Sequence, residues 1–553
     1  MIYFNNAATS FPKPNEVIEA IINYMKTGGF SLGRGSETTH LAGNIIRETR
    51  ELIAQFFNGT PERVIFTHNV TDALNLTIHG YLKAGDHVII SEMEHNAILR
   101  PLYFLEKYNK ITKTIIKCTK EGFLNPKDVE KKITDKTRMI CLNHVSNVIG
   151  TIAPIEEVGK IARKNDITYV VDAAQSAGII PIDMKKHNID ILGFTGHKSL
   201  FGPQGTGGLI LREGVEEDLI SWKQGGTGII SDEPDQQKLP LPDRFEAGTH
   251  NCHGIVGLKA GIEYVKREGI NKIRKHELSL LERMLNGLQE LEGIKIYGPC
   301  DPNKQLATIS INIEGFSPED LGFILDKSFG VITRSGLHCA PLAHKCIGSY
   351  PKGGTDRLSL GYFNTIDEVN TVLDILEQIL TKPKKSTQII RKIPKREGKH
   401  FSSGMFKKLP VEDCFKREGG TYRFEEIRLN HVEFLKPFGY LEIYDDFPKI
   451  FLRIDRPKFF RLKTTIGTKE IVVFLKNEAN DIVLKLLENQ LAKLGTCTFC
   501  GECVEICPQK AISVNNDEFK INDEICNNCL ECVRHVCPHI DNSALIDIKK
   551  SIQ

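Results

Sequence analysis

Eight of the 15 cysteines lie in the last 57 residues of this 553-residue chain, in two groups of four with short spacings. The amino terminus, MIYFNNAATSFPKP, lacks the charged and apolar regions of a signal peptide, so a disulfide framework is disfavoured. Clustered thiols in a reducing compartment indicate metal ligands instead. The sequence therefore predicts metal binding by Cys497, Cys500, Cys503, Cys507, Cys526, Cys529, Cys532 and Cys537.

A second set of reactive side chains follows apolar runs that have the composition of strands. Asp172 comes directly after YVV, with Gln175 nearby, and Thr195, His197 and Lys198 follow DILGF. Ligands of open parallel sheets bind beyond the carboxyl ends of the strands. A carboxylate can pair with a pyridinium nitrogen and a lysine can form a Schiff base, as pyridoxal phosphate requires. Taken singly, a capping Asp and an exposed Lys are the commoner explanations, and the combination favours the cofactor.

The elements that must position these residues alternate between strand and helix patterns. Amphipathic helices are predicted over 71–82 and 154–165, and one long helix over 254–291. This alternation predicts an α/β fold with a mainly parallel sheet of about residues 15–253, and a smaller α/β domain of residues 1–14 and 254–380. The first helix would begin at Thr71, where a hydroxyl and free N–H groups can hold a phosphate. The predicted strands are 64–68, 86–91, 138–145, 166–174, 190–196 and 307–313.

The remainder of the chain is predicted to form three further segments. Residues 381–402 are basic, with eight Lys or Arg between 381 and 399, which favours a solvated linker over a docking strip for an acidic partner or RNA. Residues 403–490 contain strand patterns and most of one helix pattern (481–495), which predict a β-rich domain without a recognisable chemistry. Residues 491–553 hold the eight clustered cysteines.

Composition limits the classes of protein that fit. A formal net charge of +2 argues against a global basic field for nucleic acid, and 41% hydrophobic residues suffice for substantial cores. No uncharged apolar run approaches the roughly 18 residues that a membrane span needs. We therefore expect a soluble, cytoplasmic protein of two or three domains.

Residues 1–380 resemble the class V, fold-type I pyridoxal phosphate enzymes, and within them the SUF-type cysteine desulfurases. The matching stretches occur in family order over two-thirds of the chain. They are NNAAT (5–9), EHNAILRP (94–101), HVSNVIGT (144–151), VDAAQSAG (171–178), GFTGHKSLFGPQGTGGL (193–209), RFEAGTHN (244–251) and RSGLHCAP (334–341).

The resemblance implies a role for each matching residue. Lys198 would bind the cofactor covalently and carry the α-proton, and His95 would stack on the ring. The remaining implied ligands are Asp172 on the pyridinium nitrogen, Gln175 on the phenolic oxygen, Thr71, Thr195 and His197 on the phosphate, Thr249 from the second subunit of a homodimer, and Asn147 and Arg357 on the substrate. Val70 occupies a position where the family often has a hydroxyl.

Cys339 distinguishes desulfuration from other reactions on this scaffold. In the family its thiolate attacks the substrate sulfur and becomes a persulfide, while L-cysteine becomes L-alanine. The motif RSGLHCAP sets Cys339 beside His338 on a predicted loop, where basic neighbours favour the thiolate. Cys346 is a weaker candidate for a second sulfur carrier.

The cysteine-rich tail resembles a two-cluster bacterial ferredoxin. CTFCGECVEICP and CNNCLECVRHVCP each end in Cys-Pro, which favours iron–sulfur clusters over zinc. The resemblance assigns one 4Fe–4S cluster to Cys497, Cys500, Cys503 and Cys537, and the other to Cys526, Cys529, Cys532 and Cys507. The second run has one extra residue before Cys537, so its loop must bulge.

Together these resemblances imply a cysteine desulfurase joined to an electron-transferring module. The implied partners are L-cysteine, an electron donor or acceptor, and a sulfur acceptor such as an iron–sulfur assembly protein or a tRNA-thiolation enzyme. The alternatives are a selenocysteine lyase, another C–S lyase, a transaminase, or an electron carrier whose cofactor-binding domain only docks partners.

Overall fold

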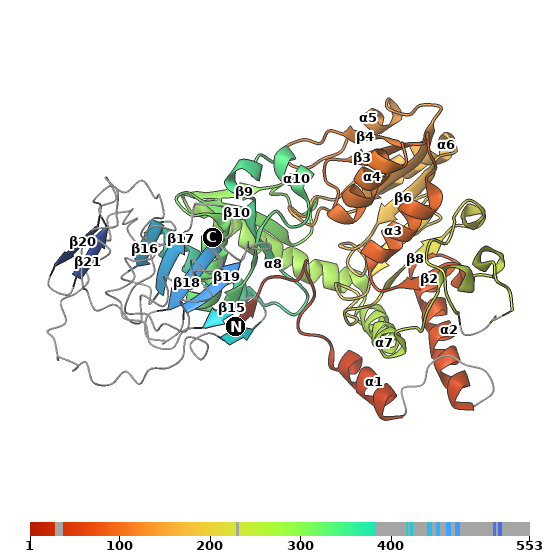
Figure 1. Cartoon of the computed structure of the whole chain (residues 1–553), viewed down its shortest axis with the longest axis horizontal. Helices are drawn as coiled ribbons and strands as arrows, with labels where there is room; N and C mark the ends of the chain where they lie inside the picture. Colours follow the sequence, from red (N-terminus) through yellow and green to blue (C-terminus); the bar gives the residue numbers. More distant parts are fainter. Residues whose placement is uncertain are drawn as a thin grey trace, which may run out of the picture. The chain divides into compact units, whose positions relative to one another are not determined.

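In this computed structural model, the structure describes residues 1–27, 37–227, 230 and 232–381, and only eight short strands beyond them. The chain divides into two compact units, Met1–Lys382 and Pro383–Gln553, and each is described by itself (Figure 1). Among the described residues, no helix is long and apolar enough to cross a membrane.

A seven-stranded sheet organises most of the first unit, with the order β2-β8-β7-β6-β5-β3-β4. The sheet is mixed, because β8 runs antiparallel to both β7 and β2 while the other strands share one direction. No crossover helix separates β7 from β8, and a direct return of the chain gives an antiparallel pair. The strands are β2 (Val64–Thr67), β3 (His87–Ser91), β4 (Thr112–Ile116), β5 (Thr137–Asn143), β6 (Thr168–Asp172), β7 (Ile191–Thr195) and β8 (Gly207–Leu211).

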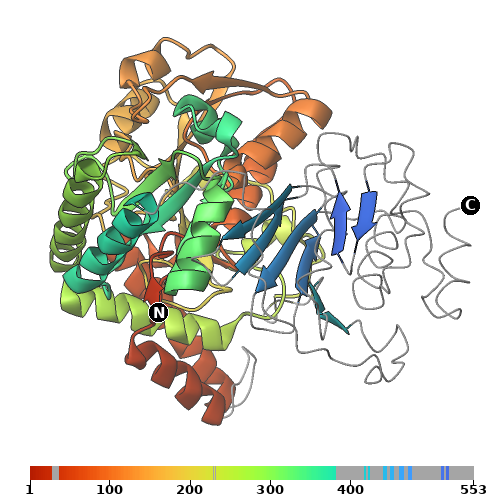
Figure 2. The same cartoon turned by 90° about the vertical axis from the view of Figure 1, so that its left-hand side faces the viewer.

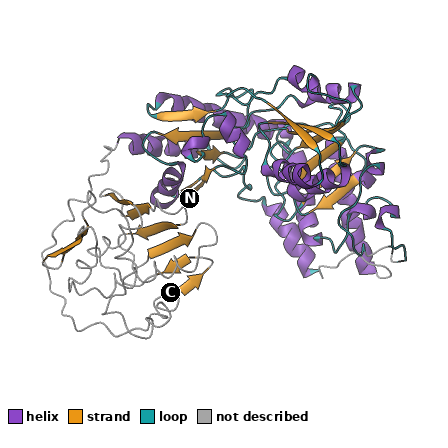
Figure 3. Ribbon diagram, turned by 45° about the horizontal axis from the view of Figure 1, so that its top comes forward, coloured by secondary structure: helices purple, strands orange, loops and turns teal. Residues whose placement is uncertain are grey.

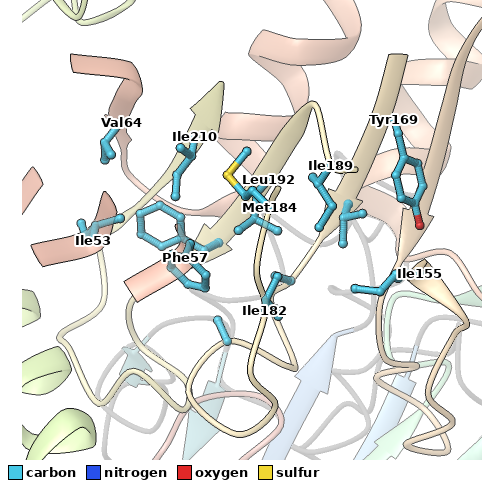
Figure 4. Packing of buried hydrophobic residues seen from close by; sticks show 14 of the residues in the cluster. Ile53, Phe57, Val64, Ile155, Tyr169, Ile182, Met184, Ile189, Leu192 and Ile210 are labelled. Atoms are coloured by element: carbon cyan, nitrogen blue, oxygen red, sulfur yellow. The ribbon is translucent and has the colours of Figure 1, made fainter. Parts of the chain in front are cut away.

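Helices cover both faces of this sheet (Figure 3). Successive strand residues point to opposite faces, so in β5 Met139 and Cys141 pack with one set of helices and Ile140 and Leu142 with the other. Figure 4 shows the second of these cores, where Phe57 packs near Leu192 and Ile210. The first set is α3 (Val70–Tyr81) and α4 (Asn96–Tyr108); the second is α2 (Glu37–Phe57), α6 (Ile155–Lys164) and α7 (Cys252–Glu268).

The predicted long helix over 254–291 is wrong in one respect. The structure divides it into α7 and α8 (Ile270–Glu290), with Gly269 between them at φ 85° and ψ 125°. Glycine populates positive φ readily, and a residue in that conformation cannot continue an α-helix. The sequence pattern is helical on both sides of Gly269, so periodicity alone does not reveal the break.

A smaller, four-stranded antiparallel sheet carries the other half of the unit, in the order β12-β13-β10-β9. The amino-terminal strand β1 (Ile2–Tyr3) pairs in parallel with β11 (Val331–Ile332), so the start of the chain belongs to this half. The strands are β9 (Ile294–Tyr297), β10 (Thr308–Ile313), β12 (Arg334–Gly336) and β13 (Thr355–Ser359). The remaining helices of the unit are α1 (Asn15–Lys26), α5 (Pro126–Glu130), α9 (Pro318–Phe329), α10 (Pro341–Cys346) and α11 (Ile366–Thr381).

In the second unit the structure describes strands only, drawn as the blue arrows of Figure 2. Six form an antiparallel sheet, β14-β15-β19-β18-β17-β16, and β20 pairs with β21. A separate β-rich domain over 403–490 stays a prediction. The helix predicted over 481–495, residues 382–402 of the linker and all eight clustered cysteines lie outside the described residues. The strands are β14 (Lys416–Glu418), β15 (Thr421–Arg423), β16 (Tyr440–Tyr444), β17 (Lys449–Arg453), β18 (Phe460–Thr465), β19 (Ile471–Leu475), β20 (Ile512–Asn515) and β21 (Glu518–Ile521).

Candidate active site

The ends of β6 and β7 bring the predicted carboxylate and lysine into one site. Asp172 ends β6 opposite Gly193 of the parallel strand β7, and Lys198 follows in the turn after β7. Asp172 is 2% exposed and accepts a hydrogen bond from Ala174 N at 2.9 Å. Burial raises its pKa, against the opposing effects of that bond and of Lys198. Burial also lowers the pKa of Lys198 to about 8, and the nearby Asp172 carboxylate offsets part of this effect.

His95 sits at the amino end of α4, where its Nδ1 accepts a hydrogen bond from Ala97 N at 3.1 Å. Burial, together with the positive charges of Lys198, Arg334 and Arg357, lowers the pKa of His95 to about 4. The imidazole is therefore neutral near pH 7. A neutral, half-buried ring beside Lys198 fits the predicted stacking role.

Two buried donors lie at the predicted phosphate end of the site. Thr195 Oγ1 and His197 Nδ1 have no hydrogen-bond partner among the described residues. Buried polar atoms are normally paired, so each of these lacks an acceptor that a phosphate oxygen would supply. Thr71 lies in the first turn of α3 and is exposed, as phosphate binding from solvent would allow. The residues present therefore fit a pyridoxal phosphate with its phosphate at Thr195 and His197.

The predicted substrate residues, like those at the phosphate end, include buried polar atoms that lack partners among the described residues. Arg357, on β13, is fully buried and donates from Nη1 to Asn147 O at 2.7 Å and from Nη2 to Asn5 Oδ1 at 3.1 Å. Arg357 Nε and Asn147 Oδ1 are buried without partners among the described residues. An N–H donor and an amide acceptor together complement the carboxylate and ammonium of an amino acid. Arg357 has five N–H groups, so it can bind a carboxylate through Nε and still keep both of these bonds.

Cys339 is exposed and lies in the loop between β12 and α10. Its backbone has a positive φ of 57°, and its carbonyl accepts a hydrogen bond from Asn96 N at 2.7 Å. Arg334 Nη2 lies 3.5 Å from Cys339 Sγ, close enough to donate to the sulfur. Cys339 and Arg334 also both affect the pKa of Lys198, so the thiol lies in the same electrostatic environment as the lysine.

The prediction that His338 supplies a basic neighbour to the thiol is wrong. Its Nε2 lies 2.8 Å from Arg334 O and its Nδ1 lies 3.0 Å from His344 Nε2, so both ring nitrogens are engaged elsewhere. Burial holds the pKa of His338 well below its ordinary value, which keeps the ring neutral. Arg334, five residues before Cys339, supplies the positive charge instead.

The remaining candidates are placed as follows. Gln175 Nε2 donates to Ala7 O at 3.1 Å. Thr249 is exposed and lines an open surface pocket with His68 and Trp222, a lining that does not include Lys198. Burial raises the pKa of Cys346 to about 12, so its thiol is protonated at neutral pH and poorly suited to carrying sulfur.

Sequence reasoning missed one buried residue directly before His95. Glu94 accepts hydrogen bonds from Ser91 Oγ at 2.5 Å, Ser91 N at 3.1 Å and Asn143 N at 2.8 Å, which link the ends of β3 and β5. Burial raises the pKa of Glu94 to about 8. The matching stretch EHNAILRP contains this residue, but an acidic residue in a motif does not reveal that it is buried.

Comparison with known proteins agrees with this fold. The class-V aminotransferase family matches residues 2–372, and the chain belongs to that family. A protein of Pyrococcus abyssi named probable cysteine desulfurase is 37% identical over 394 residues, which are 70% of this chain and 96% of that protein. A cysteine desulfurase of Escherichia coli O157:H7 is 32% identical, over 68% of this chain and 93% of its own length. The solved apo structure of a cysteine desulfurase from Thermococcus onnurineus has 37% identity and a TM-score of 0.65, covering 68% of this chain and 94% of that one.

The 4Fe–4S binding domain family matches residues 494–513. This stretch contains the first cysteine run, Cys497 to Cys507, and ends before the second run begins at Cys526. One 4Fe–4S motif is therefore present. The second cluster stays a prediction from the spacing of the cysteines.

Proposed function

We propose that this protein is a pyridoxal phosphate-dependent cysteine desulfurase that converts L-cysteine to L-alanine and leaves the sulfur as a persulfide on Cys339. The observation that carries the proposal is an exposed thiol beside Arg334 together with four buried polar atoms, on Thr195, His197, Asn147 and Arg357, that lack partners in the described part of the chain. The first two atoms suit a phosphate and the last two an amino acid. The similarity to cysteine desulfurases supports the choice of substrate.

Each residue of the site would have a defined task. When bound, pyridoxal phosphate supplies an electron sink that weakens the bonds of the substrate amino acid. Lys198 Nζ would hold the cofactor and move the substrate α-proton, His95 would cover the ring, and Asp172 would accept the pyridinium N–H. Gln175 would contact the phenolic oxygen, while Thr71, Thr195 and His197 would hold the phosphate.

Cys339 would take the sulfur atom. Its thiolate attacks the sulfur of the bound cysteine, an S–S bond forms and the C–S bond breaks, so that cysteine and one thiol become alanine and one persulfide. Arg334 Nη2, 3.5 Å from Cys339 Sγ, would donate a hydrogen bond to the sulfur before and after transfer. A thiol on an exposed loop can then pass its outer sulfur to an acceptor.

The product mixture formed from L-cysteine tests this proposal. Anaerobically purified protein and its Cys339→Ala variant are incubated with L-cysteine, and alanine, sulfide and pyruvate are measured. Alanine with an equal amount of sulfur, absent in the variant, is expected. Pyruvate, or activity that does not depend on Cys339, would identify a C–S lyase instead. Selenocysteine assayed in parallel separates a selenocysteine lyase, and loss of the cysteine amino group only when a keto-acid partner is added separates a transaminase.

We further propose that the tail carries two 4Fe–4S clusters that deliver electrons for persulfide reduction or for reductive sulfur insertion on a partner. The 4Fe–4S match at 494–513 supports one cluster, and the repeated Cys-Pro run supports the second. Iron and sulfide analysis tests the number: about eight iron atoms per chain are expected for two such clusters. Failure of reduced clusters to reoxidise when a persulfide or partner is added would contradict electron delivery.

The assembly and cellular context belong to the same proposal. The exposed Thr249 suits a contact with the cofactor phosphate of a second subunit, which would make the protein a homodimer. The sulfur acceptor would be an iron–sulfur assembly protein or a tRNA-thiolation enzyme in the cytoplasm. Sedimentation of the cofactor-loaded protein tests the dimer.

A further inference from the structure

The segment Asn5–Lys13, which joins β1 to α1, contacts three parts of the candidate site. From its amino end to its carboxyl end it meets Arg357, then Gln175, then the backbone at Lys198. Asn5 Oδ1 accepts a hydrogen bond from Arg357 Nη2 at 3.1 Å. Ala7 O accepts one from Gln175 Nε2 at 3.1 Å. The rest of the segment reaches the main chain at Lys198.

Three separate residues direct donors at the peptide group that precedes Lys198. The carbonyl oxygen of His197 accepts from Lys13 Nζ at 2.7 Å, from Thr9 Oγ1 at 3.0 Å and from Ser10 N at 3.1 Å. Ser10 Oγ donates to the carbonyl of Lys198 itself at 2.7 Å. A carbonyl oxygen has two lone pairs, so this oxygen is unusually well supplied with donors. These bonds fix the backbone on both sides of the Lys198 Cα.

Lys13 is an unusual hydrogen-bond donor for a backbone carbonyl. Its ammonium donates to His197 O and to Ser10 Oγ at 2.8 Å, and no carboxylate lies within ion-pair distance of it among the described residues. Burial lowers its pKa to about 8, which reflects the cost of keeping a cation away from water. A neutral donor would satisfy a carbonyl at lower cost. The position of the charge therefore indicates a function beyond holding a turn together.

The same segment is anchored in the smaller sheet. Ala7 N donates to Ser359 Oγ at 3.0 Å, and Ser359 N donates to Phe4 O at 2.8 Å. Ser359 ends β13, the strand that carries Arg357. The segment thus links the strand of the substrate residue to the turn of the cofactor lysine.

We propose that Ser10 and Lys13 are positioning residues for Lys198, and that Asn5 is a positioning residue for Arg357. One short segment would then set the orientation of both the lysine and the arginine that the reaction uses. This inference rests on the proposed function for the identity of the reaction. Its contacts with Lys198 and Arg357 do not depend on which amino acid is the substrate.

Variants at the two ends of the segment test the proposal. Lys13→Met removes the charged donor, Lys13→Arg keeps one, and Lys117→Met changes an exposed lysine elsewhere as a control. Asn5→Ala removes the acceptor for Arg357, and Asn5→Asp keeps it. The dissociation constant for pyridoxal phosphate, kcat and the KM for L-cysteine are measured for each variant, together with thermal unfolding.

The two ends should give different kinetic signatures. Lys13→Met is expected to weaken cofactor binding and to lower kcat, each about tenfold, with KM nearly unchanged, and Lys13→Arg should recover most of the loss. Asn5→Ala is expected to raise KM about tenfold with kcat and cofactor affinity nearly unchanged, and Asn5→Asp to restore KM. Lys117→Met should match the wild-type chain in all three quantities.

Other results would overturn the inference. If Lys13→Met leaves cofactor affinity and kcat unchanged, the segment is only structural. The same holds if Lys13→Met and Asn5→Ala change kcat and KM alike, in proportion to the thermal stability that each variant loses. If the wild-type chain binds pyridoxal phosphate but makes no alanine from cysteine, the proposed desulfurase activity fails. In that case the ratio of cofactor affinities between Lys13→Met and Lys13→Arg still decides the role of Lys13.

Discussion

The two halves of the candidate site are built in different ways. On the side of the seven-stranded sheet, Asp172 and Thr195 are the last residues of neighbouring parallel strands, and sheet hydrogen bonds fix their backbones. On the side of the smaller sheet, Cys339 lies in a loop with positive φ, and Arg357 is held by side-chain hydrogen bonds to Asn147 and Asn5. The cofactor half is thus preformed by its sheet, whereas the substrate half depends on side-chain hydrogen bonds between its own residues.

Burial acts on the cations of both halves in the same direction. Together with the charge of Arg334, it lowers the pKa of Lys198 to about 8 and that of Arg357 to about 9. At neutral pH these side chains are still largely protonated, so the site holds positive charge that is poorly solvated. An anionic ligand, such as a phosphate or an amino-acid carboxylate, would relieve this repulsion.

The largest expected effect separates the two halves directly. Lys198→Ala should lose both the visible absorbance of lysine-bound pyridoxal phosphate and alanine formation, whereas Cys339→Ser should keep the absorbance and lose alanine formation by at least about 10³-fold. A serine hydroxyl cannot form the S–S bond. Absorbance spectra and amino-acid analysis of the products measure both quantities. Substantial alanine formation by Cys339→Ser would mean that the preformed half performs the chemistry alone.

The Arg357→Lys variant tests whether Arg357, in the substrate half of the site, binds the substrate carboxylate. We expect the KM for L-cysteine to rise roughly 10- to 100-fold with a smaller change in kcat, because a lysine lacks the planar fork that can hold Asn147 and a carboxylate together. Steady-state kinetics measure both parameters. Since Arg357 is fully buried, thermal unfolding of the variant must be compared with that of the wild-type chain. An unchanged KM in a stable variant would exclude Arg357 as the carboxylate ligand.

The cofactor half and the substrate half of the site also differ in which of their residues can be predicted from the sequence. Asp172, Thr195 and Lys198 follow apolar runs, and the rule that ligands bind at the carboxyl ends of parallel strands is enough to locate them in the sequence. Arg357 and Cys339 have no comparable local signal, and only the resemblance to a family indicates them. The opposite orientation of β8 and the break at Gly269 are not predicted, because a glycine-rich run and an unbroken helical pattern do not specify strand direction or positive φ.

The contacts made by His338 and Asn5 show a second limit of sequence reasoning. His338 is next to Cys339 in the chain, yet its ring is directed to Arg334 O and His344. Asn5 is more than 350 residues from Arg357 and yet contacts it. Adjacency in sequence gives no direction for a side chain on a loop with positive φ, and only the tertiary fold brings the amino terminus to β13.

The pH dependence of cofactor loading examines the preformed half. Only the neutral amine of Lys198 can attack the aldehyde of pyridoxal phosphate, and burial lowers the pKa of this group to about 8. The loading rate of the apo-protein should therefore rise about fivefold between pH 7 and pH 8 and level off above about pH 9. Stopped-flow absorbance measures this rate, with free lysine as the reference, whose rate should continue to rise to about pH 10. A rise for the protein that parallels free lysine would show that Lys198 is well solvated.

The smallest expected effect is that of replacing Arg334, whose side chain lies within hydrogen-bond distance of the Cys339 thiol. Arg334→Gln removes the charge 3.5 Å from Cys339 Sγ, and since Cys339 is exposed, solvent should limit the loss of thiol reactivity. We expect alkylation of Cys339 at pH 7 to slow only about threefold, and less at high salt, because screening weakens such pairs. Mass spectrometry of the labelled Cys339 peptide measures the rate, and Arg138→Gln, which changes an arginine paired with Asp218 instead, is the control. A slowing of tenfold or more that salt does not reduce would show that the loop shields this pair from water, and that the substrate half is as preformed as the cofactor half.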